Sequence, residues 1–279
     1  MYCSLSLFLR DLLRQNIIDR TDNRVLLMHI TGFSHARLLA YDDYVLTQLQ
    51  VETYHQLVRR VQNGEPLAYI VGYKEVYSRQ FKVTPDTLIP RPETELLVEQ
   101  VLAKAQHGVK VLDLGTGSAC IAITLKLERP DLFITAVDKF ADTLQIAQQN
   151  ADNLHAEIEF VCGDWYSSLG KQQFDIIVSN PPYIEANDEH LTALRYEPQS
   201  ALTDFADGLS CIREIVRLSH EHLLPNGWLL IEHGYAQGES VREIFIKNGL
   251  NNVVTIRDYA DLERITIGMS NKILEKENI

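Results

Sequence analysis

The chain has 279 residues, 46% of them hydrophobic and 23% charged, which is typical of a globular protein with one large core or two smaller ones. No apolar run approaches the roughly 20 residues that a membrane helix needs, which argues against a membrane-spanning protein. The formal net charge of −12 argues against a nucleic-acid-binding protein, because neutralising phosphates requires Lys and Arg.

The first 73 residues predict a helical region. Apolar residues recur at helical spacing in four stretches, at 5–13, 25–30, 34–39 and 51–62. Thr21 and Asp22 precede the second stretch and Ser34 begins the third, and side chains of these types commonly cap helix N-termini. Asn63-Gly64 is a typical stop signal after the fourth stretch.

A Tyr-rich stretch of alternating polarity follows at about 73–83 and predicts a β-hairpin. Because the pattern on either side of this stretch differs, we expect three parts. They are a helical domain at 1–73, a hairpin linker at 74–86 and a second domain at 87–279.

The second domain alternates strands with helices. The pattern predicts strands at 109–114, 132–137, 158–162, 174–179, 228–232, 253–257 and 264–269, and helices at 121–128, 143–150, 209–223 and 240–247. Such alternation indicates an α/β fold with a mostly parallel sheet covered on both faces. Only 258–263 separate the last two strands, too few residues for a crossover, so the final strand should run antiparallel.

A glycine-rich turn follows the first of these strands. It contains Asp113, Gly115, Thr116, Gly117, Ser118 and Ala119. Glycines let the backbone turn tightly and approach a ligand just before a helix N-terminus, although a plain strand-to-helix turn uses the same residues. The dinucleotide fingerprint would need a third glycine at position 120, which is Cys120, so the pattern argues against a nicotinamide enzyme.

Two further strand ends carry acidic residues. Asp138 lies just past the end of the second strand and about 20 residues after the glycines, where a carboxylate can accept both hydroxyls of a ribose. Asp164 and Trp165 follow the third strand and offer an acceptor and an aromatic face for adenine. Each residue alone also fits a helix cap or a partly buried Trp, but together with the glycine turn they predict a nucleoside site.

The fourth strand ends in Asn180-Pro181-Pro182-Tyr183. Paired prolines stop a strand and stiffen the turn, which holds Asn180 and the Pro181 carbonyl at the carboxyl edge of the sheet. A side-chain amide oxygen beside a free carbonyl gives two acceptors suited to the two hydrogens of an NH2 group. A simple Pro-Pro turn remains the alternative for the dipeptide alone.

In this position the tetrapeptide resembles the amino-methylating, AdoMet-dependent methyltransferases. More narrowly, the chain is similar to the release-factor glutamine methyltransferases of the HemK/PrmC type over nearly its whole length. The stretches that carry the resemblance are 64–72, 87–95, 113–119, 178–184, 232–234 and 257–259. The stretch 87–95 is the most specific, because DNA-modifying relatives would not be expected to share it.

The resemblance implies a helical N-terminal domain joined to a seven-stranded, Rossmann-like methyltransferase domain. The family methylates the side-chain nitrogen of the glutamine in the Gly-Gly-Gln motif of class-1 release factors, converts S-adenosyl-L-methionine (AdoMet) to S-adenosyl-L-homocysteine and needs no metal. Its cofactor positions match 115–119, Asp138, Trp165 and Asn180, and its substrate positions match 180–183. Asn180, Pro181 and Tyr183 are the expected catalytic residues, with Asp113 and Asp164 as further cofactor contacts.

Three positions are ambiguous. The family usually has a glycine where this chain has Ala119, and we expect the methyl group to fit a helical φ. Arg91 lies between two prolines and could contact the cofactor carboxylate or only anchor its loop. His233 ends a strand, where a histidine is more often structural than a general base.

Two rival functions are an adenine-N6 nucleic-acid methyltransferase and a non-catalytic nucleoside-binding protein on the same fold. Residues 84–279 carry 16 Lys and Arg against 30 Asp and Glu, which speaks against a basic groove for nucleic acid. A protein that only binds nucleosides would have no reason to keep the Asn180 acceptor pair.

The remaining expectations concern the cell and the assembly. The four cysteines show no C-x-x-C pair, and the first ten residues lack the basic start and cleavage site of a signal peptide. We therefore expect reduced thiols and a cytoplasmic, monomeric protein.

Overall fold

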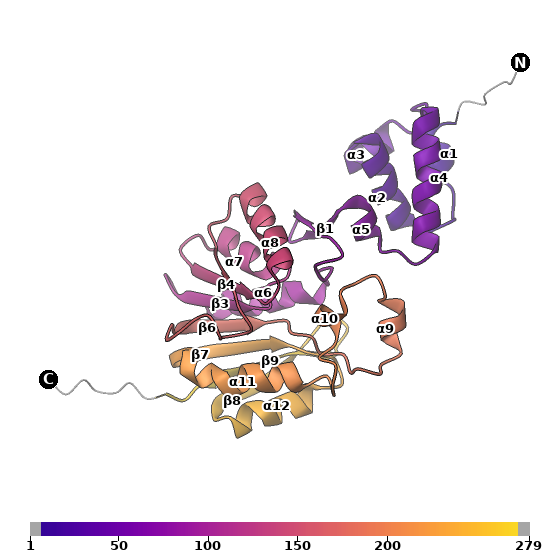
Figure 1. Cartoon of the computed structure of the whole chain (residues 1–279). Coiled ribbons are helices and arrows are strands. Elements are labelled where there is room, and N and C mark those ends of the chain that lie inside the picture. The colour runs from indigo at the N-terminus through magenta and orange to yellow at the C-terminus, as the bar shows by residue number, and fades with distance from the viewer. Residues whose placement is uncertain (1–6, 273–279) are drawn as a thin grey trace, which may run out of the picture. The chain divides into compact units, whose positions relative to one another are not determined.

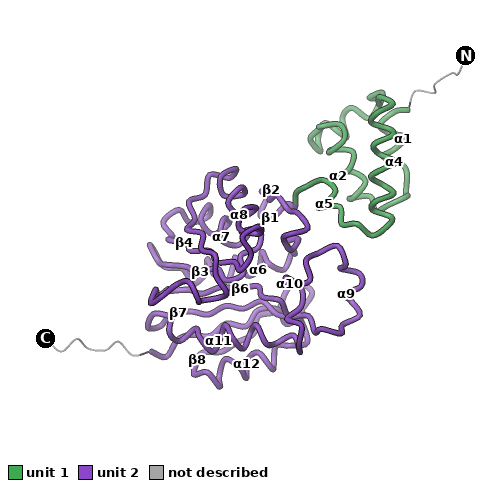
Figure 2. Tube along the Cα trace, in the orientation of Figure 1, with its two compact units in different colours: residues 1–73 green, residues 74–279 purple. Residues whose placement is uncertain are grey.

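The structure is a computed structural model that describes residues 7–272. It divides into two compact units, residues 1–73 and residues 74–279 (Figures 1 and 2). Leu5, the first residue of the predicted N-terminal helix, lies outside the described residues. In the part described, no helix is both long and apolar enough to cross a membrane.

The described part of unit 1 is helical, as predicted. Its elements are α1 (Leu9–Leu13), α2 (Arg20–Thr31), α3 (His35–Ala40), α4 (Gln48–Gln62) and α5 (Leu67–Val71). Their apolar faces meet in a core that includes Leu9, Leu26 and Leu38. One polar chain crosses this core: the Tyr54 hydroxyl donates to Asn23 Oδ1, and Asn23 Nδ2 donates to the Leu12 carbonyl, both at 2.9 Å.

The helix starts in unit 1 differ in part from the sequence predictions. Asp19 caps α2 by accepting from the amides of Thr21 and Asp22, so the two predicted caps lie inside the helix. The sequence alone does not distinguish Asp19 from these two residues, because all three side chains can cap a helix. Ser34 caps α3 as predicted. The helix α4 begins three residues before the predicted start, at the cap Thr47.

Unit 2 contains the predicted seven-stranded sheet, in the order β5-β4-β3-β6-β7-β9-β8. The strands are β3 (Lys110–Leu114), β4 (Phe133–Asp138), β5 (Glu159–Cys162), β6 (Phe174–Ser179), β7 (Leu223–Glu232), β8 (Leu250–Arg257) and β9 (Glu263–Ser270). The pairs from β5 to β7 are parallel, while β9 runs antiparallel to both β7 and β8. The predicted direction of the last strand is therefore confirmed.

Helices cover both faces of this sheet (Figure 1). On one face lie α6 (Glu93–Lys104), α7 (Cys120–Glu128) and α8 (Ala141–Leu154), and on the other lie α11 (Ser210–His222) and α12 (Gly238–Lys247). The short helices α9 (His190–Ala193) and α10 (Gln199–Leu202) follow β6. The helices α5, α6, α9 and α10 have no counterpart among the sequence predictions; α6 buries Leu97, Val98 and Val101 on a broad face that blurs its periodicity.

The predicted hairpin is present as β1 (Tyr73–Val76) and β2 (Arg79–Lys82). Its two turn residues, Tyr77 and Ser78, have φ of 50° and 59°. Asn150 of α8 ties β2 to the glycine turn, because it accepts from the Lys82 amide and donates to the carbonyls of Lys82 and Ser118.

Hydrogen bonds across neighbouring strand ends fix the carboxyl edge of the sheet. The amides of Gly115 and Thr116 both donate to the Val137 carbonyl at 2.9 Å. The Ser179 hydroxyl donates to the Leu114 carbonyl at 2.7 Å. These bonds hold the ends of β3, β4 and β6 together, so the loops that leave them start from fixed positions.

Candidate active site

A cavity of about 320 Å³ opens at this carboxyl edge of unit 2. Its volume is within the range of about 300–1,000 Å³ common for small-molecule sites. Several predicted site residues line it: Gly115, Gly117, Asp138, Asp164, Trp165, Asn180 and Pro182. The rest of the lining comes from the segment 86–88, from residues between the start of α10 and the start of α11, and from Lys139, Phe140, Thr143 and Gly163.

The other predicted site residues do not line this cavity. Asp113, Thr116, Ser118 and Ala119 are buried. Pro181 is buried and Tyr183 half-buried, next to the lining residues Asn180 and Pro182. Their assignment as cofactor or catalytic residues stays a prediction.

The two glycines of the turn have different roles. Gly115 has a φ of 70°, and a Cβ built on it would lie 3.3 Å from Trp165 Cζ3. A larger residue would therefore push the indole ring out of place. Gly117 has a φ of 57°, and a Cβ there would meet no atom within 4 Å. The backbone at Gly117 is thus open to a ligand in the cavity.

Asp138 joins the glycine turn to the next loop. Its Oδ2 accepts from the Gly117 amide at 3.0 Å and its Oδ1 accepts from the Phe140 amide at 3.1 Å. Burial raises the pKa of this carboxyl, and the backbone hydrogen bonds oppose that rise. Each oxygen keeps a lone pair, so the side chain can still accept from ligand hydroxyls.

Asp113 has no such access. The Thr116 hydroxyl donates to its Oδ2 at 2.6 Å. The carboxyl is fully buried, which raises its pKa to about 7. Asp113 therefore stabilises the turn through its hydrogen bond with Thr116 and does not line the cavity.

Ala119 corrects one sequence expectation. Its φ is 61° and its ψ 25°, in the left-handed region and not in the right-handed helical region that we expected. An L-residue there is strained by roughly 1–2 kcal/mol, which explains why a glycine suits this position. Ala119 is fully buried at the N-cap of α7.

The rim of the cavity is partly apolar and partly charged. Phe140 and Phe205 are 46% and 66% exposed and both line the cavity. Lys139 Nζ and Asp164 Oδ2 form an exposed ion pair at 2.8 Å, which contributes little stability at such a surface. Asp164 lines the cavity and is half exposed, so its carboxylate is accessible to a ligand.

Asn180 is held by a helix far away in the sequence. Its Nδ2 donates to Thr94 Oγ1 of α6 at 3.3 Å. Within residues 7–272, neither Asn180 Oδ1 nor the Pro181 carbonyl accepts a hydrogen bond. The turn thus presents the two free acceptors that the sequence analysis expected. Burial raises the pKa of the neighbouring Tyr183 to about 12, so its hydroxyl stays protonated.

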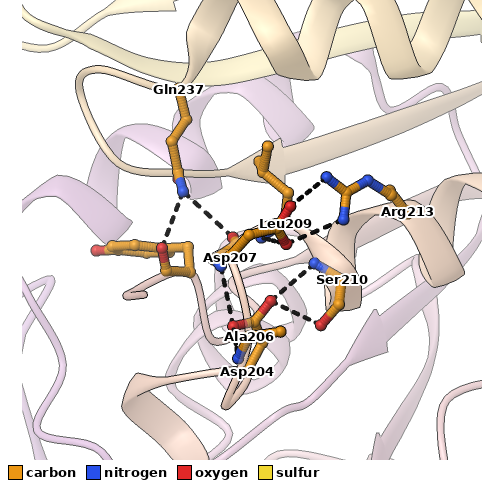
Figure 3. Close-up of polar contacts among 9 residues, drawn as sticks. Asp204, Ala206, Asp207, Leu209, Ser210, Arg213 and Gln237 are labelled. Carbon is orange, nitrogen blue, oxygen red and sulfur yellow. Dashed lines mark hydrogen bonds and ion pairs between the residues drawn. The ribbon is translucent and has the colours of Figure 1, made fainter. Parts of the chain in front are cut away.

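The far side of this turn is clamped by Gln237 (Figure 3). Its Nε2 donates to the carbonyls of Tyr183 and Gly208, at 2.9 and 3.2 Å, and its Oε1 accepts from the Gly234 amide. Gly208 has a φ of 75°, and a Cβ there would lie 2.6 Å from the Tyr183 carbonyl oxygen. Three loops therefore meet at one glutamine.

Asp204 organises the loop that contains Gly208 (Figure 3). Its carboxylate accepts from the amides of Ala206, Gly208 and Ser210 and from the Ser210 hydroxyl. Hydrogen bonds to the charged form keep the pKa of Asp204 low despite partial burial. This folds the loop 204–210 into a compact turn beside the cavity.

The two ambiguous polar residues both have structural partners. Arg91 Nη2 lies 2.6 Å from Glu197 Oε1, and Glu197 Oε2 also accepts from the Ile89 amide. Arg91 therefore anchors its loop to the segment after β6. His233 is buried, with its Nε2 2.8 Å from Thr266 Oγ1, and burial lowers its pKa.

Sequence reasoning missed part of the lining. Thr87 and Leu88 begin the stretch 87–95, which the resemblance singled out without a role in the site. Asp204 and Phe205 come from the loop before α11, and Cys211 from the first turn of α11. The Asp-rich, Gly-containing sequence of 204–208 is a turn signal, but nothing local places that turn at the cavity.

Comparisons with known proteins match this architecture. Residues 8–72 match the family model of the PrmC N-terminal domain, and residues 92–197 match the methyltransferase small domain. The release factor glutamine methyltransferase of Neisseria gonorrhoeae is 44% identical over 262 residues, 92% of this chain and 96% of that protein. That of Escherichia coli is 45% identical over 253 residues, 89% and 91% of the two chains. The chain belongs to the release factor glutamine methyltransferase family.

Solved structures of more distant methyltransferases share the fold. A methyltransferase from Pyrococcus furiosus aligns with a TM-score of 0.56 at 17% identity, over 78% of this chain and 99% of that chain. A Thermus thermophilus 16S rRNA methyltransferase in complex with AdoMet and guanosine aligns with a TM-score of 0.51 at 15% identity, over 71% and 49%. Membership of a methyltransferase family implies AdoMet as the cofactor.

Proposed function

We propose that this methyltransferase transfers a methyl group from AdoMet to the side-chain amide nitrogen (N5) of the glutamine in the Gly-Gly-Gln motif of class-1 peptide chain release factors. The observation that carries the proposal is the pair of free acceptors, Asn180 Oδ1 and the Pro181 carbonyl, in the turn at the cavity edge. A primary amide has two N–H donors, which this pair matches.

The cavity suits the cofactor. The ribose hydroxyls would bind Asp138, adenine would lie by Trp165 and Asp164, and the backbone at Gly117 leaves room for close approach. AdoMet supplies an electrophilic methyl group on a positively charged sulfur and becomes S-adenosyl-L-homocysteine. The acidic lining favours a cation over an anion such as a nucleotide phosphate. We propose that no metal takes part.

The residues of the turn orient the acceptor nitrogen. The amide lone pair of glutamine is delocalised into its carbonyl, so the nitrogen is a weak nucleophile. If Asn180 Oδ1 and the Pro181 carbonyl each accept one N–H bond, the nitrogen is fixed in place and its developing positive charge is stabilised until it releases one of its two protons to water. Both are effects of orientation and preorganised dipoles. Tyr183, protonated at neutral pH, can pack against the flat amide.

Unit 1 is proposed to bind the release factor and to take no part in the chemistry. It exposes large apolar side chains close together in sequence: Leu39, Tyr41, Val45 and Leu49, which are 49–72% exposed. Exposed apolar clusters of this kind are typical of protein-binding surfaces. We also propose that the protein acts as a cytoplasmic monomer.

An adenine-N6 nucleic-acid methyltransferase is the alternative, since such enzymes also use the tetrapeptide. The excess of acidic residues in 84–279 disfavours it. The experiment is transfer of labelled methyl from AdoMet to purified release factor, duplex DNA and free glutamine. Label in release factor alone supports the proposal, whereas label in DNA but not in release factor would refute it.

A further inference from the structure

Asn180 is the first member of a series of hydrogen-bonded side chains that continues through Thr94 to Glu232. Asn180 Nδ2 donates to Thr94 Oγ1 at 3.3 Å, and Thr94 Oγ1 donates to Glu232 Oε2 at 3.1 Å. Thr94 is in the first turn of α6 and Glu232 is the last residue of β7. Thr94 is 3% and Glu232 0% exposed. Three elements of unit 2 thus meet in one buried polar chain.

The chain has a direction. A carboxylate only accepts hydrogen bonds, so the single hydroxyl hydrogen of Thr94 must point to Glu232. Thr94 Oγ1 can then only accept from Asn180, which requires the NH2 group of Asn180 on that side. The amide oxygen of Asn180 consequently remains free for a substrate. A flipped amide would present NH2 to the NH2 of a glutamine, and two donors do not bind each other.

We propose that Thr94 and Glu232 are positioning residues that set the orientation of the Asn180 amide and so determine that it accepts from the substrate nitrogen. The inference rests on the proposed function for its catalytic consequence, but the orientation itself is a property of the free protein.

The surroundings of Glu232 make this orientation sensitive to pH. Burial raises the pKa of Glu232 to about 7, with Glu93 raising it further, while hydrogen bonding from Thr94 and from the Asn180 side chain and the charge of Arg264 lower it. Tyr183 and Cys120 also face it, and both stay protonated near neutral pH because burial raises the pKa of each to about 12. Among residues 7–272, Glu232 Oε1 has no hydrogen-bond partner within 3.5 Å.

Protonation of Glu232 would allow the hydrogen bonds along Asn180, Thr94 and Glu232 to reverse their direction. A protonated Glu232 can donate to Thr94, whose hydroxyl can then donate to Asn180 Oδ1 and turn the amide around. Because the folded pKa is raised to about 7, the correct orientation is secured above that pH and weakened below it. The turnover rate should therefore rise with pH through a one-proton step near pH 7.

The test uses four variants of the full chain. Thr94→Val removes the hydroxyl at constant size, Thr94→Ser keeps it, and Glu232→Gln removes the titration and adds a donor. Thr124→Val is the matched control, because the Thr124 hydroxyl is also buried within α7 but has no partner in the described residues. Each variant is assayed for kcat and KM on release factor, AdoMet affinity and pH profile.

We expect Thr94→Val to lower kcat by roughly 10- to 100-fold, less than the roughly 10²–10³-fold typical of losing a preorganised partner outright. KM and AdoMet affinity should change little, since Thr94 does not line the cavity. Thr94→Ser should restore most of kcat, and Glu232→Gln should lower kcat and abolish the step near pH 7. Thr124→Val should match the parent.

A second readout does not depend on substrate. The side-chain ¹⁵N–¹H₂ resonance of Asn180, assigned by its loss in Asn180→Asp, should titrate near pH 7 in the parent but not in Glu232→Gln. If the resonance titrates but the protein fails to methylate release factor, the hydrogen-bonded orientation of Asn180 stands and only the proposed function is refuted. A resonance unaffected by pH together with parental kcat in Thr94→Val would overturn the inference.

Discussion

The two turns at the carboxyl edge of the sheet are held in different ways. The glycine turn after β3 is held mainly by the ends of neighbouring strands, because Gly115 and Thr116 donate to the Val137 carbonyl and Gly117 donates to Asp138. Asn150 adds one bond, to the Ser118 carbonyl. The turn at Asn180–Tyr183 is held by single side chains far away in sequence, Thr94 and Gln237. The first turn should therefore mainly govern cofactor affinity, and the second the rate of transfer.

The largest effect should follow a change in the second turn. Asn180→Ala is expected to lower turnover on the order of 10²–10³-fold with little loss of substrate binding, because the contact strengthens as the nitrogen becomes tetrahedral. Asn180→Asp keeps an acceptor, so it should retain more activity than alanine. It also adds charge and removes the donor to Thr94, so it should remain below the parental rate. Single-turnover transfer to release factor, with AdoMet affinity measured in parallel, separates an effect on the rate from an effect on cofactor binding. Parental rates in both variants would mean that the tetrapeptide is only a turn.

A change in the first turn should act on affinity instead. Asp138→Ala removes the acceptor for the ribose and the partner of the Gly117 amide. We expect AdoMet binding to weaken by roughly 1.5–3 kcal/mol, the value for hydrogen bonds to a charged group. Calorimetric titration measures this directly. An unchanged affinity would remove Asp138 from the cofactor site.

A smaller effect is expected at the clamp of the second turn. Gln237→Ala leaves the carbonyls of Tyr183 and Gly208 without their donor, at a cost of about 1–3 kcal/mol in stability. Because Gln237 does not line the cavity, AdoMet affinity should stay within about twofold while turnover drops. Thermal unfolding gives the first quantity and titration the second. A loss of AdoMet affinity as large as that of Asp138→Ala would contradict the separation of the two turns.

The smallest effect concerns Ala119. Replacing it by glycine relieves a left-handed φ worth roughly 1–2 kcal/mol. The change also removes a buried methyl group, worth about 0.8 kcal/mol, and loosens the unfolded chain by about 0.4–1 kcal/mol. These terms nearly cancel, so the stability of Ala119→Gly in urea should stay within about 1 kcal/mol of the parent. A larger loss would mean that the methyl group packs in a way that a glycine cannot replace.

The same contrast explains what the sequence could predict. The sheet, its antiparallel last strand and the four strand-end positions follow from local periodicity and turn chemistry, as at Gly115 and Asn180. The hydrogen bond between Asn180 and Thr94 could not be predicted from the sequence, because Thr94 precedes Asn180 by 86 residues and belongs to a helix with no clear periodicity. The left-handed φ of Ala119 was missed for another reason: only the three-dimensional turn requires it.

The most direct test of the account is to locate the methyl group. Release factor is incubated with AdoMet and the full chain, digested, and mapped by tandem mass spectrometry. A parallel reaction uses a release factor whose Gly-Gly-Gln glutamine is changed to glutamate, which has no NH2 group to bind the two acceptors. The account predicts one methyl group on the side-chain nitrogen of that glutamine and none on the glutamate variant. Methylation elsewhere in the release factor, or equal methylation of both substrates, would contradict it.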